Sequence, residues 1–89
     1  MANKKVIKFY ANWCGPCKIY AKTWDKVAEE LSSDTVEFLN INVEEDTTGL
    51  AAKYKIRSIP LTVIEVDDTF LAQKSGQLKR DDLIEFINQ

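Results

Sequence analysis

The sequence predicts an α/β protein with a four-stranded mixed sheet flanked by three helices, in the order βαβα–ββα. Near the N-terminus, a long helical pattern lies between two apolar, strand-like runs; near the C-terminus, a strand–turn–strand pattern precedes another helical pattern. The first arrangement is typical of parallel strands joined by a right-handed crossover, and the second of an antiparallel hairpin. The predicted segments are residues 5–10, 14–31, 36–43, 61–66, 70–74 and 80–88.

The N-terminal half supplies the parallel pair. Residues 6–10 are apolar except at Lys8, as expected of a central strand with both faces buried. In the helix that follows, apolar residues recur at helical spacing, and Trp24 lies on this stripe and is expected in the core. Residues 32–34, Ser-Ser-Asp, end the helix. The apolar residues of the second strand are Val36, Phe38, Leu39, Ile41 and Val43.

The C-terminal half supplies the hairpin and the last helix. The loop at 44–48 carries candidate N-cap residues, so a short helix is expected after it, ending near Tyr54. Asp67 and Asp68 join the hairpin strands, because aspartate tolerates turn conformations. The last helix is expected to pack through Leu83, Ile84, Phe86 and Ile87.

Composition excludes several classes of protein. With 89 residues, of which 45% are hydrophobic, the chain is expected to form one domain with one core. The formal net charge of −2 gives no basic surface for nucleic acid. No apolar stretch approaches the ~20 residues that a membrane span needs. Residues 1–5 lead into the first strand without a signal peptide, so a cytoplasmic location is expected. The protein is also expected to be a monomer.

Cys14 and Cys17 are the only cysteines, and they lie where the first strand passes into the first helix. Cys14 is at or just before the helix N-terminus, where unpaired N–H groups and the helix dipole stabilise a thiolate. A thiolate attacks disulfides, and Cys17, one turn further on, is placed to resolve the resulting mixed disulfide. Pro16 suits the first helical turn, because its missing N–H would be unpaired there anyway.

The cysteine pair is better explained by redox chemistry than by a structural role. A disulfide between Cys14 and Cys17 closes too short a ring to stabilise the fold substantially. A zinc site needs about four ligands, and the sequence has no histidine and no third cysteine. No metal site is therefore expected.

Three segments together resemble the thioredoxin family. Residues 9–18, FYANWCGPCK, resemble its active-site segment, and residues 51–60, AAKYKIRSIP, resemble the segment that ends in its cis-proline loop. Residues 75–78, SGQL, precede the last helix as in the family. The resemblance implies a minimal thioredoxin fold over residues 1–89, closer in size to glutaredoxins. This fold would lack the N-terminal strand and helix of full-length thioredoxin.

The resemblance also implies roles for residues beside the cysteines. It places Trp13 on the surface that meets the partner protein. Gly15 and Pro16, between the two cysteines, are expected to support the active site. Tyr10 is expected to pack beneath the site, at a position where many thioredoxins carry a tryptophan.

A substrate groove is implied opposite the cysteines. Pro60 resembles the family's cis-proline, which would leave the backbone of Ile59 free to pair with an incoming substrate strand. Gly76 would leave room for that strand on its other side. Ser75 is polar where the family often has an apolar residue, which implies a less apolar groove and a different set of partners.

Lys8 is the main departure from the family pattern. Thioredoxins usually carry a buried aspartate here and a lysine on a neighbouring strand, where this sequence has Asn40. In one interpretation, Lys8 extends its ammonium group to solvent and takes no part in the chemistry. In the other, it is partly buried near Cys17, where its charge favours thiolates and the reduced form, or where its neutral amine acts as a base. Glu65 is the candidate ion-pair partner for Lys8.

These features predict a dithiol–disulfide oxidoreductase that reduces protein disulfides through Cys14 and Cys17. No bound cofactor is expected; a thioredoxin reductase, or the glutathione system, would restore the dithiol with NADPH as the distant electron source. One alternative is a glutathione-dependent, glutaredoxin-like reductase, which the chain length favours and the Cys-Gly-Pro-Cys motif opposes. The other is a thioredoxin-fold binding subunit whose redox chemistry is incidental.

Overall fold

A computed structural model describes residues 3–89. The predicted order βαβα–ββα is confirmed, and the strand boundaries differ from those predicted by at most one residue at either end. The prediction that no signal peptide precedes the first strand falls partly on residues 1–2, which lie outside the described residues. The elements are β1 (Lys4–Tyr10), α1 (Gly15–Leu31), β2 (Val36–Asn42), α2 (Leu50–Lys53), β3 (Leu61–Val66), β4 (Thr69–Ser75) and α3 (Arg80–Ile87).

The four strands form one mixed sheet in the order β2-β1-β3-β4. β1 pairs with β2 in parallel and with β3 antiparallel, so Lys8 lies between Asn40 on one side and Thr62 on the other. β3 and β4 form the predicted antiparallel hairpin. Its two turn residues, Asp67 and Asp68, have φ values of 52° and 64°, the left-handed conformation that tight hairpin turns require.

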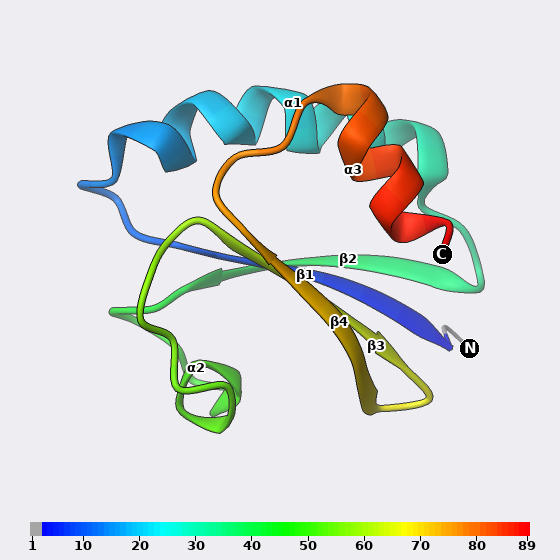
Figure 1. Ribbon diagram of the computed structural model, residues 1–89. Coiled ribbons are helices and arrows are strands. Elements are labelled where there is room, and N and C mark those ends of the chain that lie inside the picture. The colour runs from blue at the N-terminus through cyan, green and yellow to red at the C-terminus, as the bar shows by residue number, and fades with distance from the viewer. Residues whose placement is uncertain (1–2) are drawn as a thin grey trace.

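The helices cover both faces of the sheet. α1 and α3 lie on one face, and the short α2 lies on the other (Figure 1). Because side chains of a strand alternate between faces, β1 contributes Val6 and Lys8 to the α1 face and Ile7 and Phe9 to the α2 face. No helix within residues 3–89 is long and apolar enough to cross a membrane.

Trp24 is at the centre of the core on the α1 face. Its side chain is fully buried, as predicted, and its ring meets those of Tyr20 and Phe38 edge-on, with centroid distances of 5.9 and 5.3 Å. The remaining buried residues of this cluster are Val6, Val27, Ile64, Leu83, Phe86 and Ile87. This cluster fixes α1, and with it the cysteine motif at its N-terminus, on the sheet.

Glu65 is buried on the opposite, α2 face, so its expected pairing with Lys8 is wrong. On β3, Glu65 lies on the same face as Leu61 and Val63, which belong to the α2-side cluster, whereas Lys8 points toward α1. The Glu65 carboxylate accepts a hydrogen bond from the Tyr54 hydroxyl. It also forms an ion pair with Lys53, whose Nζ lies 3.2 Å from the Glu65 Oε2. Burial and the bond to Glu65 raise the pKa of Tyr54. These bonds attach the segment around α2 to the sheet.

We expect Tyr54→Phe to destabilise the protein by about 1.5–3 kcal/mol, because it leaves a buried carboxylate with one partly exposed partner. Urea unfolding measures the loss. The matched control is Lys53→Met: Lys53 is half exposed, and removing such an ion pair costs less, about 1 kcal/mol or below. Equal losses in the two variants would contradict the role given to the Tyr54 hydroxyl.

Candidate redox site

Cys14 is the N-cap residue of α1, as the sequence predicts. Its backbone is extended, and its Sγ accepts a hydrogen bond from the backbone N–H of Cys17 at 3.2 Å. Pro16 occupies the first turn. The Cys14 sulfur therefore accepts a hydrogen bond from one of the N–H groups that a helix N-terminus leaves unpaired. This bond stabilises negative charge on the sulfur.

Cys14 and Cys17 are joined by a disulfide, with their Cα atoms 5.2 Å apart. The two residues are 4% and 3% exposed, so Cys14 is buried almost as deeply as Cys17. The reason is that Cys14 is itself covered: its Sγ lies 3.9 Å from the carbonyl oxygen of Ile59. Ala11 completes the buried cluster, and Tyr10 packs against it.

The loop that leads into β3 faces the disulfide, because the start of β3 pairs with the end of β1 that precedes the cysteines. The Ile59–Pro60 peptide bond is cis, and the Pro60 carbonyl accepts a hydrogen bond of 2.9 Å from the N–H of Gly76. Gly76 has a φ of +86°, a conformation that favours glycine, and no atom would meet a Cβ there within 4 Å. The structure thus brings together the second and third segments singled out in the sequence.

Trp13 and the Ile59 loop border a shallow hollow beside the disulfide. The hollow measures about 200 Å³, and Trp13 is 68% exposed at its edge. Ser75 lies beyond the loop, with its hydroxyl 3.4 Å from that of Ser58. The other residues around the hollow are Val43, Ile56, Arg57 and Ser58. An apolar floor with polar groups at the rim suits an extended peptide.

Lys8 lies close to the site and is almost entirely buried, which favours the second of its two interpretations, in which it is buried near Cys17. The residue is 4% exposed. Its Nζ lies over the rings of Tyr10, Tyr20 and Trp24, at 5.5, 6.0 and 5.4 Å from their centroids. Burial lowers the pKa of Lys8, an effect that the charge of Asp25 opposes.

Sequence reasoning missed the polar contact next to Lys8. The Tyr20 hydroxyl and the Thr62 hydroxyl share a hydrogen bond of 2.7 Å, and both residues are buried. Burial raises the pKa of Tyr20 to about 12. A threonine within an apolar strand was the available signal, since a buried hydroxyl needs a partner.

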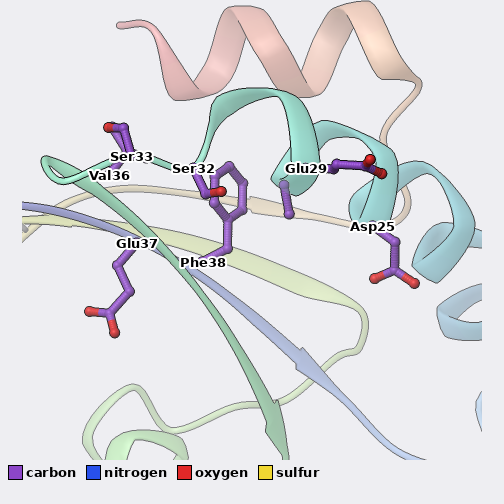
Figure 2. Close-up of a pocket in the computed structure, with 8 residues that line it drawn as sticks. Asp25, Glu29, Ser32, Ser33, Val36, Glu37 and Phe38 are labelled. Carbon is purple, nitrogen blue, oxygen red and sulfur yellow. The ribbon is translucent and has the colours of Figure 1, made fainter.

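A larger hollow, of about 710 Å³, lies between the C-terminal half of α1 and β2. Figure 2 shows Asp25 and Glu29 projecting from α1, while the Phe38 ring points from β2 toward the helix. Its lining residues are Asp25, Ala28, Glu29, Ser32, Ser33, Val36, Glu37 and Phe38. None of these is a nucleophile of the kind that the cysteine pair provides, so the redox chemistry belongs to the other end of α1.

Comparisons with known proteins agree with this geometry. The family model that matches is Thioredoxin, over residues 1–89. The chain belongs to the thioredoxin family. It is 38% identical over 87 residues to a thioredoxin of Mycoplasma pneumoniae, covering 98% of this chain and 82% of that protein. It is 34% identical over 84 residues to a thioredoxin of Haemophilus influenzae, covering 94% and 77%.

Solved thioredoxin structures share the fold. The Fasciola hepatica thioredoxin has a TM-score of 0.85 at 31% identity, over 98% of this chain and 80% of that one. A mutant thioredoxin from Halobacterium salinarum has a TM-score of 0.83 at 29% identity, over 98% and 74%. The predicted family and fold are therefore confirmed.

As a member of the thioredoxin family, the protein is a dithiol–disulfide oxidoreductase with a Cys-x-x-Cys pair joined as a disulfide. The family needs no bound cofactor for this chemistry. A glutaredoxin-like assignment is not better supported, since the matching family model and the relatives named above are thioredoxins.

Proposed function

We propose that the protein reduces disulfides of other proteins, with Cys14 as the nucleophile and Cys17 as the resolving cysteine. The Cys14 thiolate attacks one sulfur of the substrate disulfide, and the other substrate sulfur leaves as a thiolate. Cys17 then attacks the Cys14 sulfur of the mixed disulfide, forms the Cys14–Cys17 disulfide and releases the second substrate thiol. The observation that carries this order is the N-cap position of Cys14, which favours its thiolate.

The Ile59–Pro60 loop is proposed to hold the substrate chain. Within residues 3–89, the backbone of Ile59 makes no hydrogen bond to another backbone group. Its carbonyl lies next to the Cys14 sulfur, so a substrate segment bound there in extended form would present its own disulfide to Cys14. Trp13 and Ser75 supply the apolar and polar edges of this groove, and the left-handed Gly76 keeps its far side open.

The electron source is proposed to be a thioredoxin reductase that draws on NADPH, in a cytoplasmic setting, with residues 1–89 acting as a single-domain monomer. The support for this proposal is family membership and the Cys-Gly-Pro-Cys sequence at the helix N-terminus. Glutathione with its reductase is the competing donor.

The two donors can be separated by one assay. NADPH oxidation is followed with the oxidised protein and a disulfide-bonded protein substrate, with either thioredoxin reductase or glutathione plus glutathione reductase. We expect sustained turnover with the first donor and only background with the second. Turnover with glutathione alone would overturn the proposed donor, and failure of both donors together with dithiothreitol would overturn the proposed function.

A further inference from the structure

Lys8 is a buried cation without a bonded counter-charge. Lys8 and Glu65 are the two ionisable side chains, apart from tyrosine and cysteine, that are buried among residues 3–89. Glu65 has both Tyr54 and Lys53 as partners. Lys8 makes neither an ion pair nor a side-chain hydrogen bond to any described residue. Burying a charge without a bonded partner costs free energy, so another interaction must offset part of that cost.

Three aromatic rings supply part of that compensation. The Nζ of Lys8 lies within 6.0 Å of the centroids of Tyr10, Tyr20 and Trp24. Ring faces attract a cation, and this attraction is stronger where water is excluded. The rings therefore hold the ammonium group in place without neutralising its charge.

The cavity that contains Lys8 also reaches the redox pair. It measures about 340 Å³, and Lys8, Cys17 and Asn40 all line it. Asn40 is the direct cross-strand neighbour of Lys8 and carries no charge. A charge in such a partly desolvated space acts on its neighbours more strongly than a charge at the surface does.

We propose that the Lys8 ammonium group stabilises the cysteine thiolate of the reduced site, so that the Cys14–Cys17 disulfide is easier to reduce than it would be with a neutral residue at position 8. The inference rests on the proposed redox role of the two cysteines and adds a determinant of their reduction potential. Lys8 acts through the cysteine sulfur rather than on the substrate, so it is a positioning residue.

Reduction of the site transfers two electrons from a dithiol donor. The donor is oxidised to its disulfide, and the Cys14–Cys17 bond breaks. One protein sulfur receives a proton from the donor and the other remains a thiolate, so one proton is released to solvent. The thiolate then lies in the field of Lys8, and this attraction is absent from the neutral disulfide.

Other groups around the cavity set the pH range of the effect. Asp25 and Lys18 line it from α1, Tyr10 lines it from β1, and Tyr20 from α1 lies over the ammonium group with its hydroxyl bonded to Thr62 of β3. Burial lowers the pKa of Lys8, so its charge is lost earlier than usual as pH rises. The effect on the cysteines must fade over that same alkaline range.

The test compares Lys8→Met, which is neutral, with Lys8→Arg, which stays charged at every accessible pH. Each oxidised protein is equilibrated with dithiothreitol mixtures at neutral pH. We expect the equilibrium constant for reduction to fall about tenfold in Lys8→Met, equivalent to about 30 mV for a two-electron couple. Lys8→Arg should stay within about twofold of wild type. At alkaline pH, wild type should converge on Lys8→Met while Lys8→Arg does not.

An unchanged equilibrium constant in Lys8→Met overturns the proposal, and so does an equal fall in both variants, since charge would then not be the cause. If Lys8→Arg does not fold, the thiolate absorbance of Lys8→Met is followed against pH instead. The midpoint of the cysteine titration should rise by about one pH unit in this variant. A merely structural role for Lys8 would leave that titration in place. Reduction of a protein substrate by the unaltered protein under excess dithiothreitol tests the proposed function separately, whereas the Lys8 comparison measures only the equilibrium of the Cys14–Cys17 pair, so the two failures are distinguishable.

Discussion

Replacing either cysteine of the pair should abolish catalytic turnover of protein disulfides. In Cys14→Ser, the hydroxyl that replaces the thiol is not ionised at neutral pH and cannot attack a disulfide. In Cys17→Ser, the first step proceeds but the mixed disulfide is not resolved. Because the two residues act as one unit, each single loss should remove nearly all of the rate enhancement, on the order of 10³-fold or more.

The measurement is the rate of substrate reduction with dithiothreitol as electron donor, corrected for the rate without protein. Ser58→Ala is a suitable control, because Ser58 lines the groove and its hydroxyl is bonded to that of Ser75. It should keep most of the activity. Unfolding in urea checks that the cysteine variants are folded, which is expected because the ring closed by this disulfide is short. Multiple turnovers by Cys14→Ser would refute the assignment of the nucleophile.

Trp24→Ala should cause the largest loss of stability. Trp24 is completely buried between Tyr20 and Phe38, so its removal leaves a large cavity that the packed sheet and α1 cannot close. Truncations of this kind cost about 3–5 kcal/mol. Small proteins are stable by only about 5–15 kcal/mol, so the variant should be close to unfolding at room temperature.

Ile19→Ala provides the matched control on the same helix. Ile19 is 62% exposed, and substitutions at such positions usually change stability by within about 0.5 kcal/mol. Urea midpoints for the two variants give the comparison directly. A Trp24→Ala loss no larger than that of Ile19→Ala would contradict the central position of Trp24 in the core.

The elements were predictable because each has a strong local signal. The apolar stripe that contains Trp24 defines α1, the aspartate pair at 67–68 defines the hairpin turn, and the Cys-Gly-Pro-Cys motif marks where β1 passes into α1. These signals depend on neighbouring residues along the chain. The family resemblance then predicted that the Pro60 loop lies opposite Cys14. Local patterns alone do not predict this contact.

The surroundings of the charged residues were harder to predict. Whether Lys8 reaches solvent depends on the rings of Tyr20 and Trp24, which α1 places over it from a distant part of the sequence. The pairing of Glu65 was accessible in principle: strand alternation puts it on the same face as Leu61 and Val63, away from Lys8. The equal burial of the two cysteines depends on the Ile59 loop, which no pattern near Cys14 reveals.

Covalent trapping is the most direct test of the redox mechanism. Reduced Cys17→Ser protein is mixed with a disulfide-bonded protein substrate, and the products are analysed by intact mass and by mass mapping of the linked peptides. The mechanism predicts a single adduct, joined through Cys14 and released by dithiothreitol, and no adduct with Cys14→Ser. An adduct through Cys17 in Cys14→Ser, or no adduct with Cys17→Ser, would contradict the assignment of Cys14 as the attacking residue.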